Sequence, residues 1–526
     1  MDYGYLSLIP PLVAIGLAFI TRKVVISLIV GIVSGAFIAT KWQIIATIKK
    51  TFTIIWQSTE LGNLSSMSSF LDSWNLFILL FTISLGVIVV LVSRAGGARA
   101  YGNWAIKKVK TKKGASFATM LLGVVIFFDD YFNTLTVGTV MKPVTDRFKM
   151  SRAKLAYLID STAAPVVILA PVSSWVADVI AKIRISGVGD TYPGNPFAVF
   201  LQTVFFNTYA WMTLLMVGII CWGKVEFGSM KKCEDHAAET GDVFCGDEER
   251  ELCEEEAMGK ISDKGTLIDL ILPLAVMMVC VIGFMLYTGG FWLFGGANSF
   301  AQAFMNMNSA KSLFLGGCVA LVYTCAQFMV RKLFSPKEIP YLFWRGFRIM
   351  LPANIILILA WSIGTVIKDE VQTGLFLASL IDENFFTFLL PAVFFVLSCL
   401  TSFSTGTSWG TFGIMIPIAV PLCFELEPLL MVPCVAATLA GAIYGDHASP
   451  ISDTTILSST GAGVKHIDHV RTQIPYATTV ALVCFVGYLI TGLTIQYGLV
   501  ISGVINFVLC TLMLAFLLKR FNQVSK

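Results

Sequence analysis

The stretch "VVIFFDDYFNTLTVGTVMKP", residues 124–143, places two adjacent aspartates, Asp129 and Asp130, inside an apolar run. The run covers residues 115–141, which is long enough to cross a bilayer, because a spanning helix needs about 20 predominantly apolar residues. Lys and Arg nevertheless dominate both of its flanks. Since short cytoplasmic loops collect these basic residues, both ends are predicted to face the cytoplasm. The run therefore indicates a re-entrant hairpin, with the two aspartates near its tip.

The composition of the whole chain is typical of a membrane protein. Of its 526 residues, 56% are hydrophobic and 13% are charged, and the mean hydropathy is +0.78. Soluble domains carry about 25% charged residues. The net charge is only +4 and no basic block alternates with aromatic residues, so we expect a lipid bilayer and no nucleic acid as partner. No nucleotide-binding loop or hydrolase motif is present, so we expect neither an enzyme nor an ATP-driven pump.

The two halves of the chain share one order of apolar segments. Each half is interpreted as three helices, a hairpin, a broken helix and a further helix. The hairpins are predicted at 115–141 and 385–423, and the broken helices at 155–182 and 429–463. Acidic flanks predict that the second hairpin enters from outside, and such inverted repeats are typical of secondary transporters. We therefore expect an all-α polytopic membrane protein with an inverted-topology repeat, two re-entrant hairpins, two broken helices and about 11 spanning helices.

Charge and hydropathy divide the chain into four segments. The first membrane repeat is predicted at 1–222, the second at 266–496, and an extra C-terminal helix and tail at 497–526. Between the repeats, residues 223–265 form a predicted acidic cytoplasmic loop, whose cysteines are expected to stay reduced. One interpretation of this loop is an ordinary acidic linker. The other is a zinc site, whose ligands would be Cys233, His236, Cys245 and Cys253.

Polar residues at the four predicted breaks are the candidates for function. The breaks hold carboxylates, hydroxyls, an amide and freed carbonyls, which are the oxygen ligands that hard cations such as Na⁺ prefer. In transporters such breaks meet near the membrane midplane. The candidate substrate- or ion-binding residues are Asp129, Asp130, Asn133, Thr134, Thr136, Ser161, Thr162, Ser404, Thr405, Thr407, Ser408, Trp409, Asp446, His447, Ser449 and Asp453. The candidate Na⁺ ligands among them are Asp130, Asn133, Ser404, Thr405 and Thr407.

Each charged candidate also has a structural alternative. A charged residue at membrane depth costs about 2.5–3.5 kcal/mol on insertion scales, so the aspartate pair indicates a function. The alternative is that one of the two aspartates caps a half-helix at the hairpin tip. His447 is either a proton- or substrate-handling group, since His titrates near neutrality, or a structural residue. Asp178 is interpreted as an interfacial cap rather than a site residue.

Most of these candidates lie in the segments "IFFDDYFNTLTVG", "DSTAAPVVILAPVSSW", "STGTSWGTFGIMIPIAVPL" and "GDHASPISDTTILSSTGA". The segments resemble the NhaC family of sodium/proton antiporters, and the resemblance extends over residues 74–475. It implies Na⁺/H⁺ exchange by a fold with paired hairpins and broken helices. It also implies a homodimer, which is common in the ion-transporter superfamily that includes this family. Other members resemble malate/lactate exchangers and organic-solute carriers, so the resemblance implies ion coupling rather than one cargo.

The sequence therefore predicts a sodium-coupled secondary active transporter without a cofactor. The first hypothesis is a Na⁺/H⁺ antiporter that works by alternating access. The alternative is a Na⁺-coupled transporter or exchanger of an organic acid or amino acid, and a passive channel is the third hypothesis. We expect a multi-pass protein of the inner membrane of a prokaryotic cell. Lys519 and Arg520 predict a cytoplasmic C-terminus.

Overall fold

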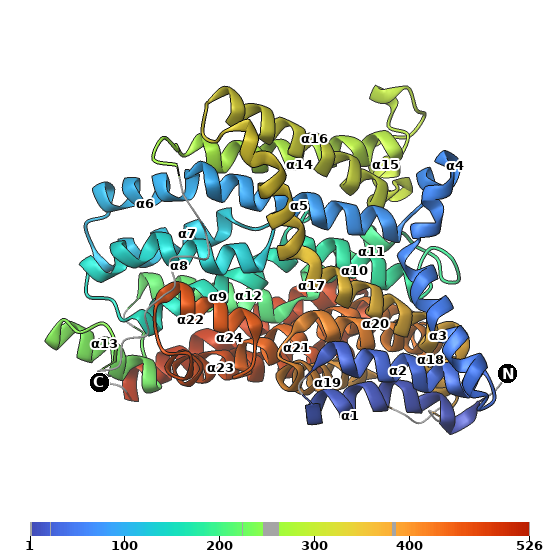
Figure 1. The fold of residues 1–526 in the computed structure, drawn as a ribbon. Helices are drawn as coiled ribbons and strands as arrows, with labels where there is room; N and C mark the ends of the chain where they lie inside the picture. Colours follow the sequence, from blue (N-terminus) through green and yellow to red (C-terminus); the bar gives the residue numbers. More distant parts are fainter. Residues whose placement is uncertain (1–2, 22, 224, 246–261, 381–385, 525–526) are drawn as a thin grey trace.

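The protein is built of helices, most of which run along one common direction (Figure 1). The computed structural model describes residues 3–21, 23–223, 225–245, 262–380 and 386–524. In these ranges nine helices are long and apolar enough to cross a membrane, or up to 11 if each of two bent pairs is one span. The same ranges contain no β-strand, only isolated bridges. The predicted all-α polytopic fold is confirmed.

The helices follow the order of apolar segments in the sequence. Those before the acidic loop are α1 (Ile9–Thr21), α2 (Val24–Ala39), α3 (Ile44–Thr59), α4 (Met67–Leu71), α5 (Asn75–Ala95), α6 (Gly97–Lys108), α7 (Lys112–Val125), α8 (Asp130–Arg147), α9 (Arg152–Leu169), α10 (Ser174–Ile185), α11 (Pro196–Phe206) and α12 (Thr208–Trp222). The loop contains α13 (Gly228–Thr240). The later helices are α14 (Ile268–Thr288), α15 (Phe300–Asn306), α16 (Ser309–Val330), α17 (Ile339–Thr365), α18 (Thr373–Leu380), α19 (Leu390–Thr405), α20 (Ser408–Leu426), α21 (Met431–Ala448), α22 (Asp453–Ala462), α23 (His466–Thr494) and α24 (Leu499–Val524). The limits predicted for the four segments stay a prediction.

The first hairpin consists of α7 and α8, which pack against each other. Its outer ends meet, since the Lys112 side chain donates to the Lys149 carbonyl at 3.2 Å. At the turn, the side-chain amide of Asn133 donates to the backbone carbonyls of Gly123 and Ile126 at 2.7 and 2.8 Å. These bonds satisfy carbonyls that the end of α7 leaves free, so the chain can turn at membrane depth. The first predicted re-entrant hairpin is confirmed.

The first broken helix is α9 followed by α10, which meet at an angle of 47°. The break lies at residues 170–173, within the predicted segment 155–182, and falls at Pro171 rather than at Pro165. Helix α9 runs through Pro165 and ends at Ala170, whose ψ is 137°. The cause is Pro171, because proline forces the residue before it out of the helical region. Asp160 therefore lies within a continuous helix.

A second bend separates α11 from α12, at an angle of 46°. The sequence predicted a further helix after the first broken helix and did not predict this bend. The break falls at Asn207, whose side chain accepts a hydrogen bond from the Ala210 amide at 3.3 Å and so caps α12. Asn is among the preferred residues at this position.

The second hairpin turns at Gly406 between α19 and α20. Gly406 has a φ of +68°, and a Cβ there would lie 2.4 Å from the Ile451 carbonyl oxygen, so the position requires glycine. The second broken helix, α21 and α22, is interrupted at residues 449–452. The Ser449 hydroxyl ties this break to the hairpin by donating to the Phe403 carbonyl at 2.7 Å. Both predicted elements are confirmed, although the first residue of the hairpin prediction, 385, lies outside the described residues.

The acidic loop packs against the membrane part through α13, which contacts α9 and α23. Glu234 is buried, forms an ion pair with Lys112 at 2.7 Å and accepts a hydrogen bond from the Ser151 amide at 2.6 Å. Burial would raise the pKa of Glu234, but the charges of Lys154 and Lys112 outweigh burial and hold that pKa below its usual value. Glu234 thereby fastens the starts of α7 and α9.

The cysteines of the loop differ from the expectation. Cys233 and Cys245 form a disulfide with their Cα atoms 4.4 Å apart, so the prediction that they stay reduced is wrong. They meet because α13 ends at Gly241, whose φ of +81° lets the chain turn back. Among the described residues no group of three or more His, Cys, Asp or Glu could hold a metal ion, so they give no support to the zinc site. Cys253, its fourth proposed ligand, lies outside the described residues.

Candidate ion-binding site

The two hairpin tips and the two broken helices meet inside the protein. The Phe128 carbonyl at the first tip accepts a hydrogen bond from the Ser174 amide at 3.0 Å, and the Gly406 carbonyl at the second accepts one from the Asp453 amide at 3.3 Å. The Tyr131 hydroxyl joins the two pairs by donating to Asp453 at 2.6 Å. Helices α8, α10, α20 and α22 all start here, and the N-terminal ends of their dipoles favour negative charge.

Asp129 has the geometry of a helix cap. One carboxylate oxygen accepts from the Phe132 amide in the first turn of α8 at 2.9 Å. The other accepts from the Ser174 hydroxyl at 3.2 Å, which joins the tip to α10. Both oxygens therefore have partners, and the capping alternative describes this residue.

Asp130 has a different environment. Its side chain is 0% exposed, and neither carboxylate oxygen has a partner in hydrogen-bond geometry, although the Trp175 indole N–H, which is itself unpaired, lies near the carboxylate. Its charged neighbours are two further carboxylates, those of Asp129 and Asp453. A buried carboxylate without a partner is costly, so the site requires a neutralising proton or cation.

Asp446 closes the second hairpin tip. One carboxylate oxygen accepts from the amide and the hydroxyl of Ser408, at 3.2 and 2.9 Å, at the start of α20. The other accepts from the Ser452 hydroxyl at 2.5 Å. Asp453 retains two partners, the Tyr131 hydroxyl and the Thr454 amide at 2.8 Å. The second tip is thus capped by a carboxylate from another helix.

The neutral candidates fall into two groups by what their side chains bind. The hydroxyls that donate to nearby backbone carbonyls belong to Thr134, Thr162, Ser404, Thr405 and Ser449. Three buried oxygens have no partner, those of the Asn133 carboxamide and the Thr136 and Thr407 hydroxyls. Only this second group combines burial with wholly unused oxygens.

Two further candidates lie on the walls of the cluster. Ser161 is buried within α9. Trp409 is also buried, and its ring centroid lies 6.1 Å from that of Trp175 on α10. Trp409, on α20 of the second hairpin, therefore packs against α10 of the first broken helix.

His447 belongs to a second polar cluster, which we call the Asp160 cluster and define by Asp160, His447, His469 and Gln473. The Nδ1 atom of His447 forms a hydrogen bond of 3.1 Å with the Tyr209 hydroxyl. Its backbone carbonyl accepts from Gln473 at 2.8 Å. Sequence reasoning missed His469 and Gln473, although their spacing of four residues places both on one face of α23.

Asp178 is not the interfacial cap that the sequence indicated. Its side chain is 0% exposed and forms an ion pair with Lys182, which is equally buried. The Lys182 ammonium also donates to the Trp409 carbonyl at 3.2 Å and lies 5.8 Å from the Phe412 ring centroid. Opposite charges four residues apart in an apolar helix were the signal that could have found this pair.

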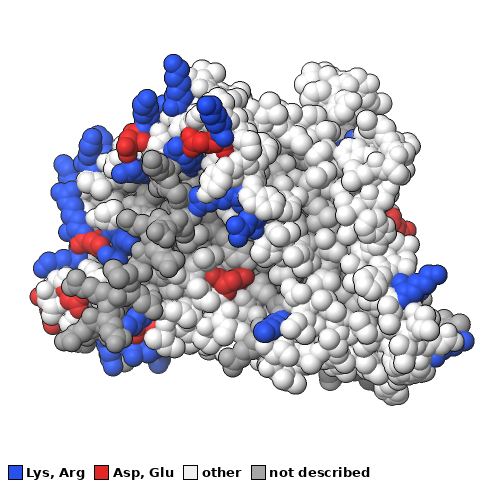
Figure 2. All heavy atoms as spheres, viewed as in Figure 1, with Lys and Arg blue, Asp and Glu red and all other residues white. Residues whose placement is uncertain are grey.

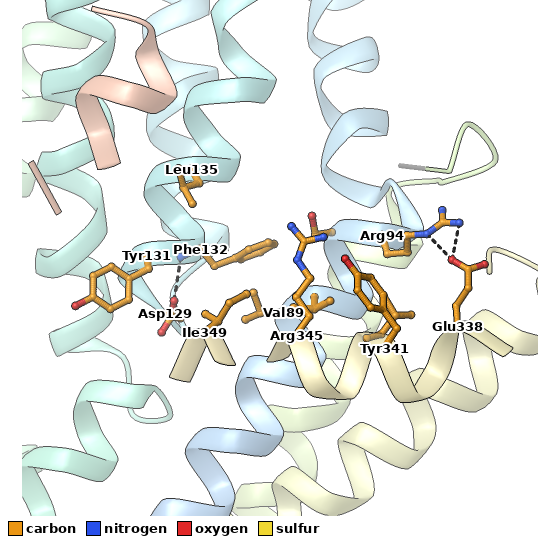
Figure 3. Close-up of a pocket in the computed structure, with 13 residues that line it drawn as sticks. Val89, Arg94, Asp129, Tyr131, Phe132, Leu135, Glu338, Tyr341, Arg345 and Ile349 are labelled. Atoms are coloured by element: carbon orange, nitrogen blue, oxygen red, sulfur yellow. Dashed lines mark hydrogen bonds and ion pairs between the residues drawn. The ribbon is translucent and has the colours of Figure 1, made fainter. Parts of the chain in front are cut away.

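A cavity of about 350 Å³ leads to the first hairpin tip. Figure 3 shows Asp129 and Tyr131 at one side of it and an ion pair of Arg94 and Glu338 at the other. The Arg94 guanidinium donates two hydrogen bonds to one Glu338 oxygen, at 3.1 and 3.0 Å. Arg345 on α17 also lines the cavity. Arg94 lies in the last turn of α5, so the cavity extends from the first hairpin tip to the C-terminal end of α5.

Comparison with solved structures shows the fold alone. Neisseria gonorrhoeae MtrF, described as illuminating a class of antimetabolite efflux pumps, has a TM-score of 0.50 and 12% identity, with 85% of this chain and 83% of that chain covered. The similarity agrees with the all-helical fold.

Sequence comparison shows the family. An uncharacterized protein of Haemophilus influenzae is 38% identical over 497 residues, which cover 93% of this chain and 91% of the relative. The malate-2H⁺/Na⁺-lactate antiporter of Bacillus subtilis is 28% identical over 245 residues, 44% of this chain and 45% of the relative. The arginine/ornithine antiporter ArcD of Halobacterium salinarum is 37% identical over 116 residues, 21% of this chain and 24% of the relative. The model of the Na⁺/H⁺ antiporter family matches residues 166–493. This chain therefore belongs to the Na⁺/H⁺ antiporter family, whose members are membrane transporters.

Proposed function

We propose that this protein is a secondary antiporter that exchanges Na⁺ for H⁺ at Asp130. The observation that carries the proposal is the complete burial of Asp130 without a partner for either oxygen. Ionisable groups at membrane depth mark ion pathways, because their cost must be offset by function. Since an uncompensated carboxylate is strongly disfavoured in a medium of low dielectric constant, the departure of Na⁺ is coupled to the arrival of a proton.

The neutral oxygens around the tips are suited to complete a Na⁺ site. The unused oxygens of Asn133, Thr136 and Thr407 join the Asp130 carboxylate as ligands in this proposal. Ser404 and Thr405, also predicted as ligands, already donate to backbone carbonyls and offer only their remaining lone pairs. Asp129 and Asp446 keep the two tips closed and add negative charge nearby.

Alternating access follows in this proposal from the opposite entry of the two hairpins. In Figure 1, α7 and α8 of the first hairpin lie on the side of α6 and α13, whereas α20 of the second hairpin lies toward the N-terminus. Helices α8 and α22 cross so closely that a Cβ on Gly138 would lie 2.5 Å from the Gly461 carbonyl carbon. Small residues at such crossings let helices pack tightly. We propose that α8 and α22 move together relative to the rest.

An exchanger of organic acids or amino acids is the second candidate. A specific observation favours it, namely that the cavity of about 350 Å³ carries Arg94 and Arg345 among its lining residues. Guanidinium groups bind carboxylates with good geometry. The Bacillus and Halobacterium relatives are named for malate and lactate and for arginine and ornithine, which belong to the same class of cargo.

We propose that the end of the molecule with α6, α13 and the C-terminus faces the cytoplasm of a prokaryotic cell. Lys and Arg gather at this end in Figure 2, which supports the assignment through the positive-inside rule. We further propose that the protein works as a homodimer in the inner membrane. Mass measurement of the protein in nanodiscs tests this, and a single copy per particle would contradict it.

Flux measurements in proteoliposomes distinguish the two candidates. With a pH-sensitive dye inside, an imposed Na⁺ gradient should move protons in the absence of any organic solute. The same vesicles are then offered labelled lactate, malate, arginine and ornithine with and without Na⁺. Sodium-driven proton movement that needs no solute supports Na⁺/H⁺ exchange. Solute uptake without such proton movement would replace it by the second candidate.

A further inference from the structure

Asp160 is the centre of a polar cluster that is separate from the two hairpin tips. Its side chain is 0% exposed in the middle of α9. From α22 it accepts hydrogen bonds from the hydroxyls of Thr455 and Ser458, each at 3.2 Å. From α23 it accepts one from the Gln473 amide at 2.5 Å. These three donors satisfy the carboxylate in its ionised form.

The His469 imidazole lies close enough to this carboxylate for a protonated ring to form an ion pair with it. Its Nε2 lies 3.4 Å from an Asp160 oxygen, an ion-pair distance outside hydrogen-bond geometry. The ring is fully buried, and its Nδ1 has no partner. If the imidazole takes up a proton, Asp160 becomes its counter-ion. If it releases the proton, the three neutral donors still hold Asp160, so neither state leaves a buried charge uncompensated.

The cluster also holds both sides of the break in α21 and α22. The Gln473 amide that binds Asp160 donates in addition to the His447 carbonyl at 2.8 Å, near the end of α21. The Thr455 hydroxyl, at the start of α22, lies 3.4 Å from the backbone carbonyl oxygen of Asp446. A change of charge at His469 therefore acts on the segment that positions Asp446 and Asp453.

We propose that Asp160 and His469 form a proton-binding site separate from the acidic hairpin tips, and that its occupancy sets the affinity of the tips for a cation. The coupling to cation affinity rests on the proposed function, whereas the proton site stands on the geometry alone. The proton binds the imidazole of His469 and comes from water that enters the protein. Asp160 is a positioning residue, since it acts through His469.

Other titratable groups face the pair and contribute to its environment. They are Asp446 and His447 on α21 and Asp453 on α22. All three are acidic or imidazole groups, whose charge depends on proton binding. The cluster is thus electrically connected to the tips without sharing a side chain with them.

The proton site is tested by deuterium exchange at the imidazole C2 carbon, read by mass spectrometry for each of the four histidines of the chain between pH 5 and 9. The exchange rate at His469 should depend on pH in the wild type, and its pH profile should differ in Asp160→Asn, because the counter-ion is lost. An exchange rate at His469 that does not depend on pH, or the same pH profile in both proteins, overturns the proposal. His236, on α13, should give the same profile in both proteins and serves as the internal control.

The coupling is tested by Na⁺ binding to the purified protein at pH 6 and pH 8.5. The wild-type affinity should rise between these values, and His469→Gln should reduce that rise by about fivefold or more, the lower end of typical coupling. At pH 8.5 its affinity should stay within twofold of wild type, as should that of the control His236→Gln. An unchanged rise in His469→Gln overturns the coupling. If the wild type binds no Na⁺, the proposed function fails, while the titration still decides the proton site.

Discussion

A helix begins at each of the two hairpin tips and needs a cap, and the two tips obtain that cap from different parts of the chain. At the first tip, Asp129 caps α8 from its own chain position, through the Phe132 amide. At the second tip, the amide at the start of α20 is held by Asp446, which comes from α21. Each tip therefore uses a carboxylate as a cap. The difference is that the first tip carries a second carboxylate, Asp130, for which the protein supplies no partner.

This comparison separates structural from functional charge. A capping carboxylate has N–H or O–H donors, so its negative charge is satisfied within the fold. Asp130 lacks such donors, and the corresponding unused group at the second tip is a neutral hydroxyl, that of Thr407. The first tip therefore supplies an unpartnered carboxylate, which the second tip does not.

Asp130→Asn should reduce transport in proteoliposomes at least about 100-fold, because an amide can neither take up a proton in this pH range nor neutralise a cation. The amount of folded protein should not fall, since Asp130 has no hydrogen bond to lose. Asp263→Asn is the matched control, because Asp263 is an exposed partner of Arg99 at the surface. Transport by Asp130→Asn equal to that of the control would remove the functional role of the first tip.

Gly406→Ala should destabilise the second tip by about 2–5 kcal/mol, since it combines a left-handed backbone with an added methyl group in a packed site. The Cβ would lie 2.4 Å from the Ile451 carbonyl oxygen. Gly295→Ala is the control, because Gly295 is also left-handed, with a φ of +85°, but no atom lies within 4 Å of the new Cβ. The control should cost only about 1–2 kcal/mol in thermal unfolding. Equal losses would mean that contact with Ile451 is unimportant.

Asp129→Ala should cost about 1–2 kcal/mol in thermal unfolding, the usual loss for a removed cap. Asp129→Asn should cost much less, because Asn is an equally good capping residue, and its transport should stay within about tenfold of wild type. Loss of transport in Asp129→Asn, at the same level as in Asp130→Asn, would show that both carboxylates meet the ion.

Glu234→Gln should loosen the end of the first hairpin at α13 by about 1–3 kcal/mol at neutral pH, because it removes the buried partner of Lys112 and one of the two carboxylates that face Lys154. The measurement is hydrogen exchange of α13 and of the neighbouring residues 148–151. The pKa of Glu234 is lowered in the folded protein, so its contribution is complete above the ordinary Glu pKa of about 4.3 and is lost as the pH falls through the lower folded value. The difference between variant and wild type should accordingly shrink below about pH 4. A difference that persists unchanged at pH 3 would assign the effect to packing.

The fold could largely be predicted from the sequence, since it depends on local patterns. Basic flanks on both sides of one apolar run predicted the first hairpin, and acidic flanks predicted the second. The sequence offered two prolines for the first break and did not distinguish them, and it missed the second bend. Pro165 lies within α9, whereas Pro171 ends that helix. Asn207 interrupts a uniformly apolar run by capping, which hydropathy does not report.

The candidate site could be predicted only in part, because its contacts join residues far apart in the chain. The sequence identified the tip and break residues as polar groups in apolar segments. It did not predict that Asp446 caps α20, nor that Asp160 meets His469 from α23. Lys182 was missed because its partner, Asp178, was interpreted as lying at the interface. The pairings of Asp446 with α20 and of Asp160 with His469 depend on the packing of helices against one another and have no signature within a single segment.

The most direct test of the central claim is the proton release that accompanies Na⁺ binding. The purified protein in weakly buffered detergent solution is titrated with Na⁺ while a pH indicator reports protons, with choline chloride as the ionic control. The account predicts that wild type and Asp129→Asn release protons on addition of Na⁺, whereas Asp130→Asn releases none. Proton release by Asp130→Asn equal to that of wild type would contradict the claim that Na⁺ and H⁺ share Asp130.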